Sequence, residues 1–212
     1  MQKNKQFIVL DLDETLIHSF EDKFSVFEDL RLRGIEHLET RVYMIDFILG
    51  GERLKRWGVV RPDVDHFIDY CFERFDKVIV WSAASYPYVH HICDVVFQDR
   101  KPHAILTQDD CQNVGGYITN KPLDVLYNRF DEINETNTYI VDDNDSVTKL
   151  NDRNAIQVPG YTVNVRETDR EEETIRKIID DSDKALSDLV RWFDRDTSRH
   201  SNVQNIPKPK MV

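Results

Sequence analysis

Several features are scarce in this 212-residue chain, and each absence removes a class of protein. Lysine and arginine number 28 against 39 aspartates and glutamates, so the formal charge is -11, which argues against nucleic-acid binding through a basic face. No apolar run approaches the roughly 18 residues of a membrane span. The opening MQKNKQ, followed by a predicted strand, lacks the pattern of a signal peptide. We therefore expect an intracellular protein, nuclear or cytoplasmic, that is neither secreted nor membrane-spanning and does not bind nucleic acid directly.

Cysteine is also scarce. Cys71, Cys93 and Cys111 are widely spaced, with no CxxC pair and no histidine pairing. This pattern indicates neither a disulfide framework nor a zinc site, and it favours a reducing compartment. The length, with 40% hydrophobic and 32% charged residues, suits one globular domain or one domain with an insertion.

Short apolar runs that alternate with helical patterns indicate the fold class. Residues 7–10, 78–81 and 138–141 are rich in β-branched or aromatic residues and predict buried strands. Strands that alternate with helices favour an α/β fold, a doubly wound, Rossmann-like parallel sheet with helices on both faces. The predicted helices cover 61–75, a stretch from about 86–88, a stretch from 121, 168–179 (opened by a Thr168–Glu171 capping box) and 183–193.

Two stretches depart from this alternation. The region of about 20–60 alternates, turns at Gly-Gly and resumes, which predicts a small β-hairpin inserted after the first strand. Residues 98–120 suggest a second small β excursion. We expect a single domain over 1–196 and a C-terminal tail over 197–212, where the helical periodicity is lost.

The most informative stretch is FIVLDLDETLIHS, residues 7–19. A buried strand ends there in Asp11 and Asp13, and in α/β sheets ligands bind beyond the carboxyl ends of the strands. Side chains at i and i+2 of an extended segment share a face, so both carboxylates would face the same crevice. A solvated strand-end turn is the alternative for an arbitrary DxD. The preceding buried run and the following Thr15 disfavour it.

This motif resembles that of the haloacid dehalogenase superfamily. DLDETLIHS is similar in particular to the phosphatases that act on the C-terminal domain (CTD) of RNA polymerase II and to their small-CTD-phosphatase relatives. The resemblance implies that Asp11 is a nucleophile that forms an aspartyl-phosphate. It implies that Asp13 is the general acid, and then the general base for hydrolysis of that intermediate.

The other family motifs follow in the expected order over residues 7–146. WSAASYPYV supplies Ser82 after the second buried strand, where the family hydrogen-bonds the phosphoryl group. NKPLDVLY supplies Lys121, which in the family neutralises phosphate oxygens and orients the nucleophile. IVDDNDS supplies Asp142 and Asp143, which match the acidic motif that holds magnesium. Alone, each has an ordinary alternative, as a strand-end serine, a surface lysine or a solvated turn.

The family pattern implies Mg²⁺ as the cofactor, because several anions facing an anionic substrate require a cation and hard oxygen ligands suit this one. The implied ligands are the Asp11 carboxylate, the Asp13 backbone carbonyl and the Asp143 side chain. Asp142 acts next to the metal or through water. The sequence does not rank Asp142 against Asp143.

Candidate substrate-binding residues are Thr15, Phe20, Phe47, Tyr88 and Gln108. In small CTD phosphatases the insertion forms an apolar pocket for a proline-containing phosphopeptide, and alternation places Tyr43, Ile45, Phe47 and Leu49 on one face. Packing of the hairpin on the core is an equal alternative, as is helix packing for Tyr88. The chain departs from the family at Gln108, where an arginine would give a bidentate phosphate contact.

These observations lead to three hypotheses. The first is a Mg²⁺-dependent phosphoserine/phosphothreonine protein phosphatase acting on a disordered phosphopeptide such as the polymerase CTD. The second is a superfamily phosphatase for a small molecule or a nucleic-acid end. It is disfavoured by Glu14, where many small-molecule members have glycine. The third is a non-catalytic phosphopeptide or presequence receptor, disfavoured because the full set of catalytic residue types is present.

Overall fold

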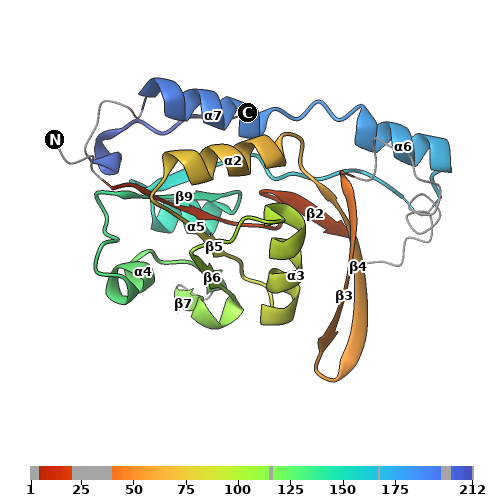
Figure 1. Cartoon of the computed structure of the whole chain (residues 1–212), viewed down its shortest axis with the longest axis horizontal. Coiled ribbons are helices and arrows are strands. Elements are labelled where there is room, and N and C mark those ends of the chain that lie inside the picture. Colours follow the sequence, from red (N-terminus) through yellow and green to blue (C-terminus); the bar gives the residue numbers. More distant parts are fainter. Residues whose placement is uncertain (1–4, 21–39, 115–116, 167, 197–201, 212) are drawn as a thin grey trace.

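A five-stranded parallel sheet forms the centre of the molecule (Figure 1). The computed structural model describes residues 5–20, 40–114, 117–166, 168–196 and 202–211. The order of the strands is β10-β9-β1-β5-β6, so β1 lies between β9 and β5 and the chain reverses its winding there. This arrangement confirms the predicted α/β class. The strands are β1 (Phe7–Leu10), β5 (Lys77–Trp81), β6 (Ala104–Leu106), β9 (Thr138–Asp142) and β10 (Ala155–Gln157).

Successive side chains of β1 point to opposite faces of the sheet, and each face is covered by its own apolar core. Ile8 and Leu10 face helices α2 (Val64–Arg74), α3 (Tyr86–Phe97) and α7 (Ala185–Asp196). Phe7 and Val9 face the opposite core, with α4 (Asp124–Arg129) and α5 (Asp145–Leu150). Helices therefore cover both faces, as predicted. In the described part of the chain, no helix is both long and apolar enough to cross a membrane.

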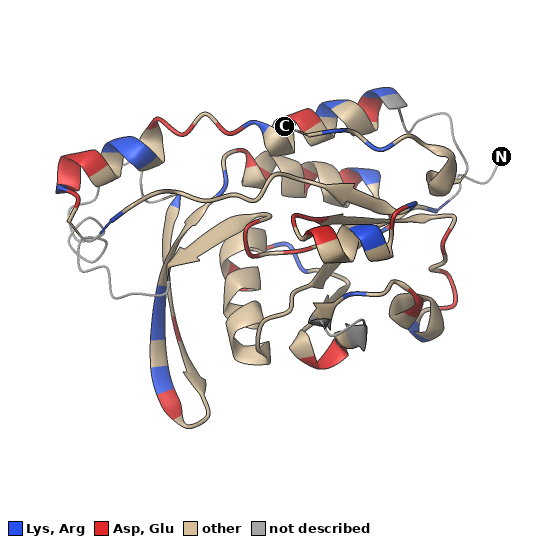
Figure 2. Ribbon diagram, turned by 180° about the vertical axis from the view of Figure 1, so that it is seen from behind, with Lys and Arg blue, Asp and Glu red and all other residues tan. Residues whose placement is uncertain are grey.

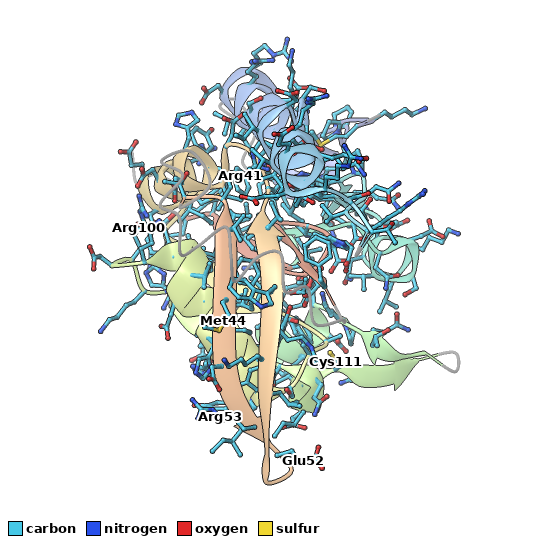
Figure 3. The ribbon with its side chains drawn as sticks, turned by 90° about the vertical axis from the view of Figure 1, so that its right-hand side faces the viewer. Arg41, Met44, Glu52, Arg53, Arg100 and Cys111 are labelled. Carbon is cyan, nitrogen blue, oxygen red and sulfur yellow. The ribbon has the colours of Figure 1, made fainter. Side chains whose placement is uncertain are left out.

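The insertion after β1 is larger than the predicted hairpin. It is a three-stranded antiparallel sheet of order β2-β4-β3, built from β2 (Ile17–Phe20), β3 (Val42–Leu49) and β4 (Glu52–Val60). The strand β2 pairs with the second half of β4. The alternation of apolar residues in β3 and β4 predicts a hairpin of these two strands, but it does not indicate that β2 joins them as a third strand. Figure 3 shows the β3–β4 hairpin extending from the body of the molecule, with Glu52 and Arg53 near its far end. Residues 21–39 of the predicted insertion lie outside the described residues.

The second β excursion predicted within 98–120 is present. It consists of β7 (Gln112–Val114) paired antiparallel with β8 (Tyr117–Asn120), and it follows a short 3-10 helix, η1 (Gln108–Asp110). The hairpin leads directly into Lys121. It thereby delivers this residue to the sheet edge where β1 and β9 end.

Two predictions near the C-terminus are wrong. The helix α6 (Glu171–Ile179) begins at Glu171, so this residue is the first of the helix and cannot complete a capping box with Thr168. Its acidic first turn and basic last turn instead suit the helix dipole (Figure 2).

The expected tail also fails for residues 202–211. The 3-10 helix η2 (Val203–Asn205) donates the Val203 N–H to the Thr136 carbonyl at 2.8 Å. Val203 and Ile206 are buried in the same core as α2, α3 and α7. Helical periodicity cannot reveal such a segment, because its two apolar side chains lie on irregular backbone.

Candidate active site

The candidate site forms where β1 and β9 end side by side. Leu10 is paired with Val141, and the Asp11 N–H continues the ladder by donating to the Val141 carbonyl at 3.1 Å. The next residues on the two strands are therefore Asp11 and the pair Asp142 and Asp143. The Asp11 and Asp142 side chains are buried, and Asp143 is partly exposed. This is the edge at which α/β sheets bind ligands.

A tight turn follows Asp11. The Leu12 carbonyl accepts the N–H groups of residues 15–17 at 2.8–3.2 Å. Glu14 adopts a left-handed conformation, with φ of 55°, which is uncommon for a residue other than glycine. The carbonyls of Leu12 and Glu14 both accept hydrogen bonds, whereas that of Asp13 takes part in no backbone hydrogen bond among the described residues. In this part of the turn, the backbone therefore leaves the Asp13 carbonyl unpaired among the described residues.

The Thr15 side chain joins the two strand ends. Its hydroxyl donates to Asp11 Oδ2 at 3.3 Å and accepts the Asp143 N–H at 3.1 Å. Its oxygen also lies 3.4 Å from Asp143 Oδ1. Thr15 was predicted to bind substrate; these contacts give it a positioning role between the acids.

Lys121 lies between two of the acids. Its ammonium Nζ is 2.5 Å from Asp11 Oδ1 and 2.7 Å from Asp142 Oδ2, and all three side chains are buried. Burial alone would lower the pKa of Lys121, but Asp11 and Asp142 together raise it, so the side chain is charged at neutral pH. The structure brings together the lysine and the acids that the sequence singled out.

Asn151, a residue outside the sequence motifs, holds the Lys121 segment in place. Its side-chain nitrogen donates to the Lys121 carbonyl at 3.0 Å, and its oxygen accepts the Leu123 N–H at 3.1 Å. Asn151 stands at the C-terminal end of α5. A helix that starts from the acidic motif thus also fixes the lysine. An asparagine at a helix end gave no sequence signal for this role.

Asp142 and Asp143 differ in how their oxygens are used. Both oxygens of Asp142 are engaged by the protein, Oδ2 by Lys121 and Oδ1 by the Asn144 N–H at 2.8 Å. Asn144 in turn caps α5 by accepting the Ser146 N–H. The Asp143 carboxylate has one polar contact within the described residues, at 3.4 Å between its Oδ1 and the Thr15 oxygen, whose hydrogen is already given to Asp11. Asp143 is therefore the more available ligand, a ranking that the sequence left open.

The acids crowd one another. Burial, reinforced by Asp11, raises the pKa of Asp142 above its ordinary value. Burial, with Asp11 and Glu14, raises the pKa of Asp143 to about 6. Carboxyl groups whose ionised forms are disfavoured in this way gain stability from a bound cation.

The donor set fits a hard divalent cation. Oxygens of Asp11, Asp142 and Asp143 lie within 4.8 Å of one another. Within the described part of the chain, this cluster contains neither histidine nor cysteine, which suits Mg²⁺ better than zinc or copper.

Asp13 is held by a phenol. Tyr88, on α3, donates its hydroxyl to Asp13 Oδ1. Burial raises the pKa of Asp13 to about 7, with a further contribution from Asp11, although the Tyr88 hydrogen bond acts in the opposite direction. A carboxyl group that titrates near neutrality is suited to donate a proton and later accept one. Tyr88, predicted from its place in the motif, thus contacts a candidate catalytic acid.

Ser82 follows β5 at the same edge of the sheet. It is buried, its N–H donates to the Leu106 carbonyl, and its hydroxyl oxygen accepts the Ala84 N–H at 3.1 Å. The described contacts do not join Ser82 to Asp11, so its phosphate-binding role stays a prediction.

The remaining substrate-binding candidates lie in three places. Phe47 is buried against Tyr88, with ring centroids 5.9 Å apart. Phe20 is buried in a separate apolar cluster with Trp57 and Tyr161. Gln108 is exposed at the start of η1, where its N–H donates to the Ala84 carbonyl. Burial of Phe20 and Phe47 favours core packing over the alternative of a peptide pocket.

At the carboxyl edge of a doubly wound α/β sheet, the structure thus places Asp11 and Asp142 around Lys121, with Asp143 beside them. The family model for NLI interacting factor-like phosphatases matches residues 6–191, so the chain belongs to that family, and the predicted family resemblance is confirmed.

Two curated relatives and two solved structures are similar to the chain. A CTD phosphatase-like protein, 355R, of Invertebrate iridescent virus 6 is 27% identical over 182 residues, which cover 80% of this chain and 93% of that protein. Phosphatase PSR1 of Saccharomyces cerevisiae is 26% identical over 119 residues, 56% of this chain but only 24% of PSR1. The structure of Fcp1, an essential RNA polymerase II CTD phosphatase, matches with a TM-score of 0.59 at 20% identity, over 95% of this chain and 56% of that one. The fission yeast Fcp1 bound to beryllium fluoride matches with a TM-score of 0.64 at 17% identity, over 95% and 69%. At these identities the two structures show the fold alone.

Proposed function

We propose that this chain is a Mg²⁺-dependent phosphoserine/phosphothreonine protein phosphatase that works through an aspartyl-phosphate. One observation carries the proposal. Two carboxyl groups two residues apart lie in opposite environments, Asp11 against a buried ammonium and Asp13 against a phenol with its pKa raised to about 7. Such a division lets one group attack as an anion while the other supplies a proton.

Asp11 is the nucleophile in this proposal. A carboxylate oxygen of Asp11 bonds to phosphorus while the bond from phosphorus to the substrate oxygen breaks, and Asp13 protonates the departing alkoxide. Water then attacks the phosphorus of the aspartyl-phosphate and gives its proton to Asp13, while the bond from phosphorus to the Asp11 oxygen breaks, which releases inorganic phosphate and restores the Asp11 carboxylate. Lys121 holds the orientation of Asp11 from within 2.5 Å and stabilises the negative charge of the phosphoryl group.

Asp11, Asp143 and the Asp13 carbonyl would hold Mg²⁺, which supplies charge neutralisation for the phosphoryl group. Asp142 then acts as a positioning residue, because the protein already engages both of its oxygens. Phosphoryl transfer depends mainly on positioning and charge neutralisation, and this cluster offers both.

The substrate part of the proposal comes from family membership. The matching family consists of NLI interacting factor-like phosphatases, and two relatives in the comparisons are described as CTD phosphatases or CTD phosphatase-like. We infer that the substrate is a phosphorylated protein segment, with a polymerase CTD-type peptide as the first candidate. A small phosphate ester or a nucleic-acid end is the competing candidate.

Turnover of three substrate types tests this proposal. Phosphoserine peptides of the CTD type, nucleotide monophosphates and 3′-phosphorylated DNA are compared with Mg²⁺ and with EDTA. We expect the peptide to be hydrolysed with the highest kcat/KM and all activity to stop with EDTA. Asp11→Asn should abolish turnover, whereas Asp152→Asn, at an exposed acid, should not change it. Activity that survives EDTA or Asp11→Asn contradicts the mechanism, and a preference for nucleotides contradicts the substrate.

A further inference from the structure

A row of hydroxyl groups leads from the inserted sheet to Asp13. The Tyr43 hydroxyl, on β3, lies 2.6 Å from Ser19 Oγ, on β2. Ser19 Oγ lies 2.5 Å from the Tyr88 hydroxyl, which donates to Asp13 Oδ1. The groups come from β2, β3, α3 and the turn after β1. They therefore connect the insertion to the candidate general acid through hydrogen bonds alone.

The number of hydrogens fixes the direction of this row. Each hydroxyl has one hydrogen to donate. Tyr88 gives its hydrogen to Asp13, so its contact with Ser19 can form only if Ser19 donates. Ser19 then accepts from Tyr43. All of the hydroxyls therefore point toward the Asp13 carboxyl group.

The two phenols are buried, which keeps them as donors. Tyr43 is 6% exposed and Tyr88 is 9% exposed. Burial raises the pKa of both phenols, so they stay protonated at neutral pH. The ring of Phe47 packs edge-on against that of Tyr88 and restricts its movement. The row thus occupies a fixed, solvent-poor position, in which hydrogen bonds reinforce one another.

Gly58 on β4 makes room for the first member of the row. A methyl group at this position would lie 2.2 Å from the Tyr43 hydroxyl oxygen and 2.3 Å from the ring carbon that bears it. No side chain tolerates contacts this short. Gly58 is paired with Tyr43 across the two strands, so the glycine lets the tyrosine ring cross β4 and reach Ser19.

We propose that Tyr43 and Ser19 are positioning residues for Asp13. They hold the Tyr88 hydroxyl against Asp13 Oδ1, so that Oδ2 is the oxygen that exchanges a proton with the leaving group and then with water. The inference rests on the proposed function, because it needs Asp13 to act as the general acid. It adds residues of the inserted sheet to the machinery of the reaction.

The consequence is a dependence on the leaving group. A serine alkoxide is a poor leaving group and needs the proton from Asp13, whereas 4-nitrophenolate departs without one. A defect in the position of Asp13 should therefore lower kcat/KM for a phosphoserine peptide more than for 4-nitrophenyl phosphate. A general loss of folded protein would lower both equally.

Tyr43→Phe removes one hydroxyl and keeps the ring. We expect kcat/KM for the phosphoserine peptide to fall roughly threefold to tenfold, which is a part of the ~10²–10⁴-fold effect of general acid catalysis. For 4-nitrophenyl phosphate, kcat/KM should fall by less than about twofold, because its leaving group needs no proton. The matched control is Tyr139→Phe, whose buried hydroxyl has no hydrogen-bond partner in the described part of the chain. It should leave both values unchanged.

A double-mutant cycle with Tyr88→Phe tests whether the Tyr43 hydroxyl acts on Asp13 through the Tyr88 hydroxyl or independently of it. Once the Tyr88 hydroxyl is absent, Tyr43→Phe should cause no further loss for the peptide. Equal losses on both substrates, no loss, or losses that multiply in the double variant would each overturn the inference. If the wild-type chain hydrolyses neither substrate with Mg²⁺, the proposed function itself fails. Thermal unfolding of each variant confirms that the comparisons are made on folded protein.

Discussion

Lys121 and Asp11 form a buried ion pair across the carboxyl edge of the sheet, with 2.5 Å between the ammonium nitrogen and Oδ1. Asp142 contacts the same ammonium from the neighbouring strand. A charge so far from solvent is stable only while its partners are present. The site is therefore part of the stability of the fold as well as the candidate centre of its chemistry.

Lys121→Gln should impair both stability and turnover. The substitution leaves the Asp11 and Asp142 carboxylates buried without their cation. Because a buried charge without its partner is strongly destabilising, the free energy of unfolding should fall by about 3–5 kcal/mol. Urea unfolding without added metal measures this loss, and phosphatase assays measure turnover. Lys5→Gln, at an exposed pair with Glu132, is the control and should unfold at the wild-type midpoint. A Lys121→Gln variant of wild-type stability would show that the pair contributes nothing.

Asp143→Asn and Asp142→Asn should affect the metal differently. Asp143 has the freer oxygens, so its substitution should raise the Mg²⁺ concentration for half-maximal activity on the order of tenfold or more. Asp142→Asn disturbs Lys121 instead, and it should lower kcat with a smaller change in that Mg²⁺ concentration. Metal titrations of turnover in both variants measure the difference. The reverse pattern would make Asp142 the ligand.

Asp183 stabilises the turn that carries Asp11, through Arg61. The buried Arg61 guanidinium donates to both oxygens of Asp183 at 2.8 Å and to the Thr15 carbonyl at 2.9 Å. Asp183→Asn should lower the free energy of unfolding at pH 7 by about 2–3 kcal/mol, less than for a fully buried pair, because the Asp183 side chain is 22% exposed.

The difference between wild type and Asp183→Asn should depend on pH. Burial alone would raise the pKa of Asp183, but Arg61 outweighs it and holds that pKa below its usual range. In the unfolded protein the pKa of an aspartate is about 3.9. Because the pKa of Asp183 is lower in the folded protein, the ion pair contributes its full stabilisation at pH values above the unfolded pKa. That stabilisation is lost as the pH falls through the folded pKa. Urea unfolding at pH 7 and at about pH 3 should show a difference that shrinks in acid. A constant difference would exclude the ion pair as its source.

Ile206→Ala tests whether the C-terminal segment belongs to the core. Ile206 is 3% exposed, so the truncation should lower the free energy of unfolding by about 2–4 kcal/mol. Ile48→Ala is the control, because Ile48 is 65% exposed and its loss should change stability by less than about 0.5 kcal/mol. Equal midpoints in thermal or urea unfolding would show that residues 202–211 do not stabilise the fold.

The sequence predicted those parts of the site that follow from parallel strands. Buried strands can be recognised from their apolar, β-branched composition. Parallel neighbouring strands end at the same edge of the sheet, so the residues that follow them lie close together, as Asp11 does to Asp142 and Asp143. Lys121 was found by family resemblance, since its place depends on a hairpin and a short helix that bear no charge pattern of their own.

The sequence could not predict contacts that depend on tertiary packing. Ser19 and Tyr43 look like ordinary strand residues until β2 is placed beside β4, and Asn151 looks like an ordinary helix end. Thr168 illustrates the converse: its capping pattern is correct in spacing, yet the helix begins at Glu171. A short motif indicates where a helix could begin, but tertiary packing decides where it does begin.

Gly58 closes its position to every other residue, whatever stands at position 43. A Cβ atom there would lie 2.2 Å from the Tyr43 hydroxyl oxygen and 2.6 Å from the His18 backbone carbonyl oxygen. Loss of the phenol would remove the first contact and leave the second, because the second is made by the neighbouring strand itself. The glycine is therefore a requirement of the three-stranded sheet, with Ser19 and Tyr43 on either side of it, as well as of the phenol that crosses it.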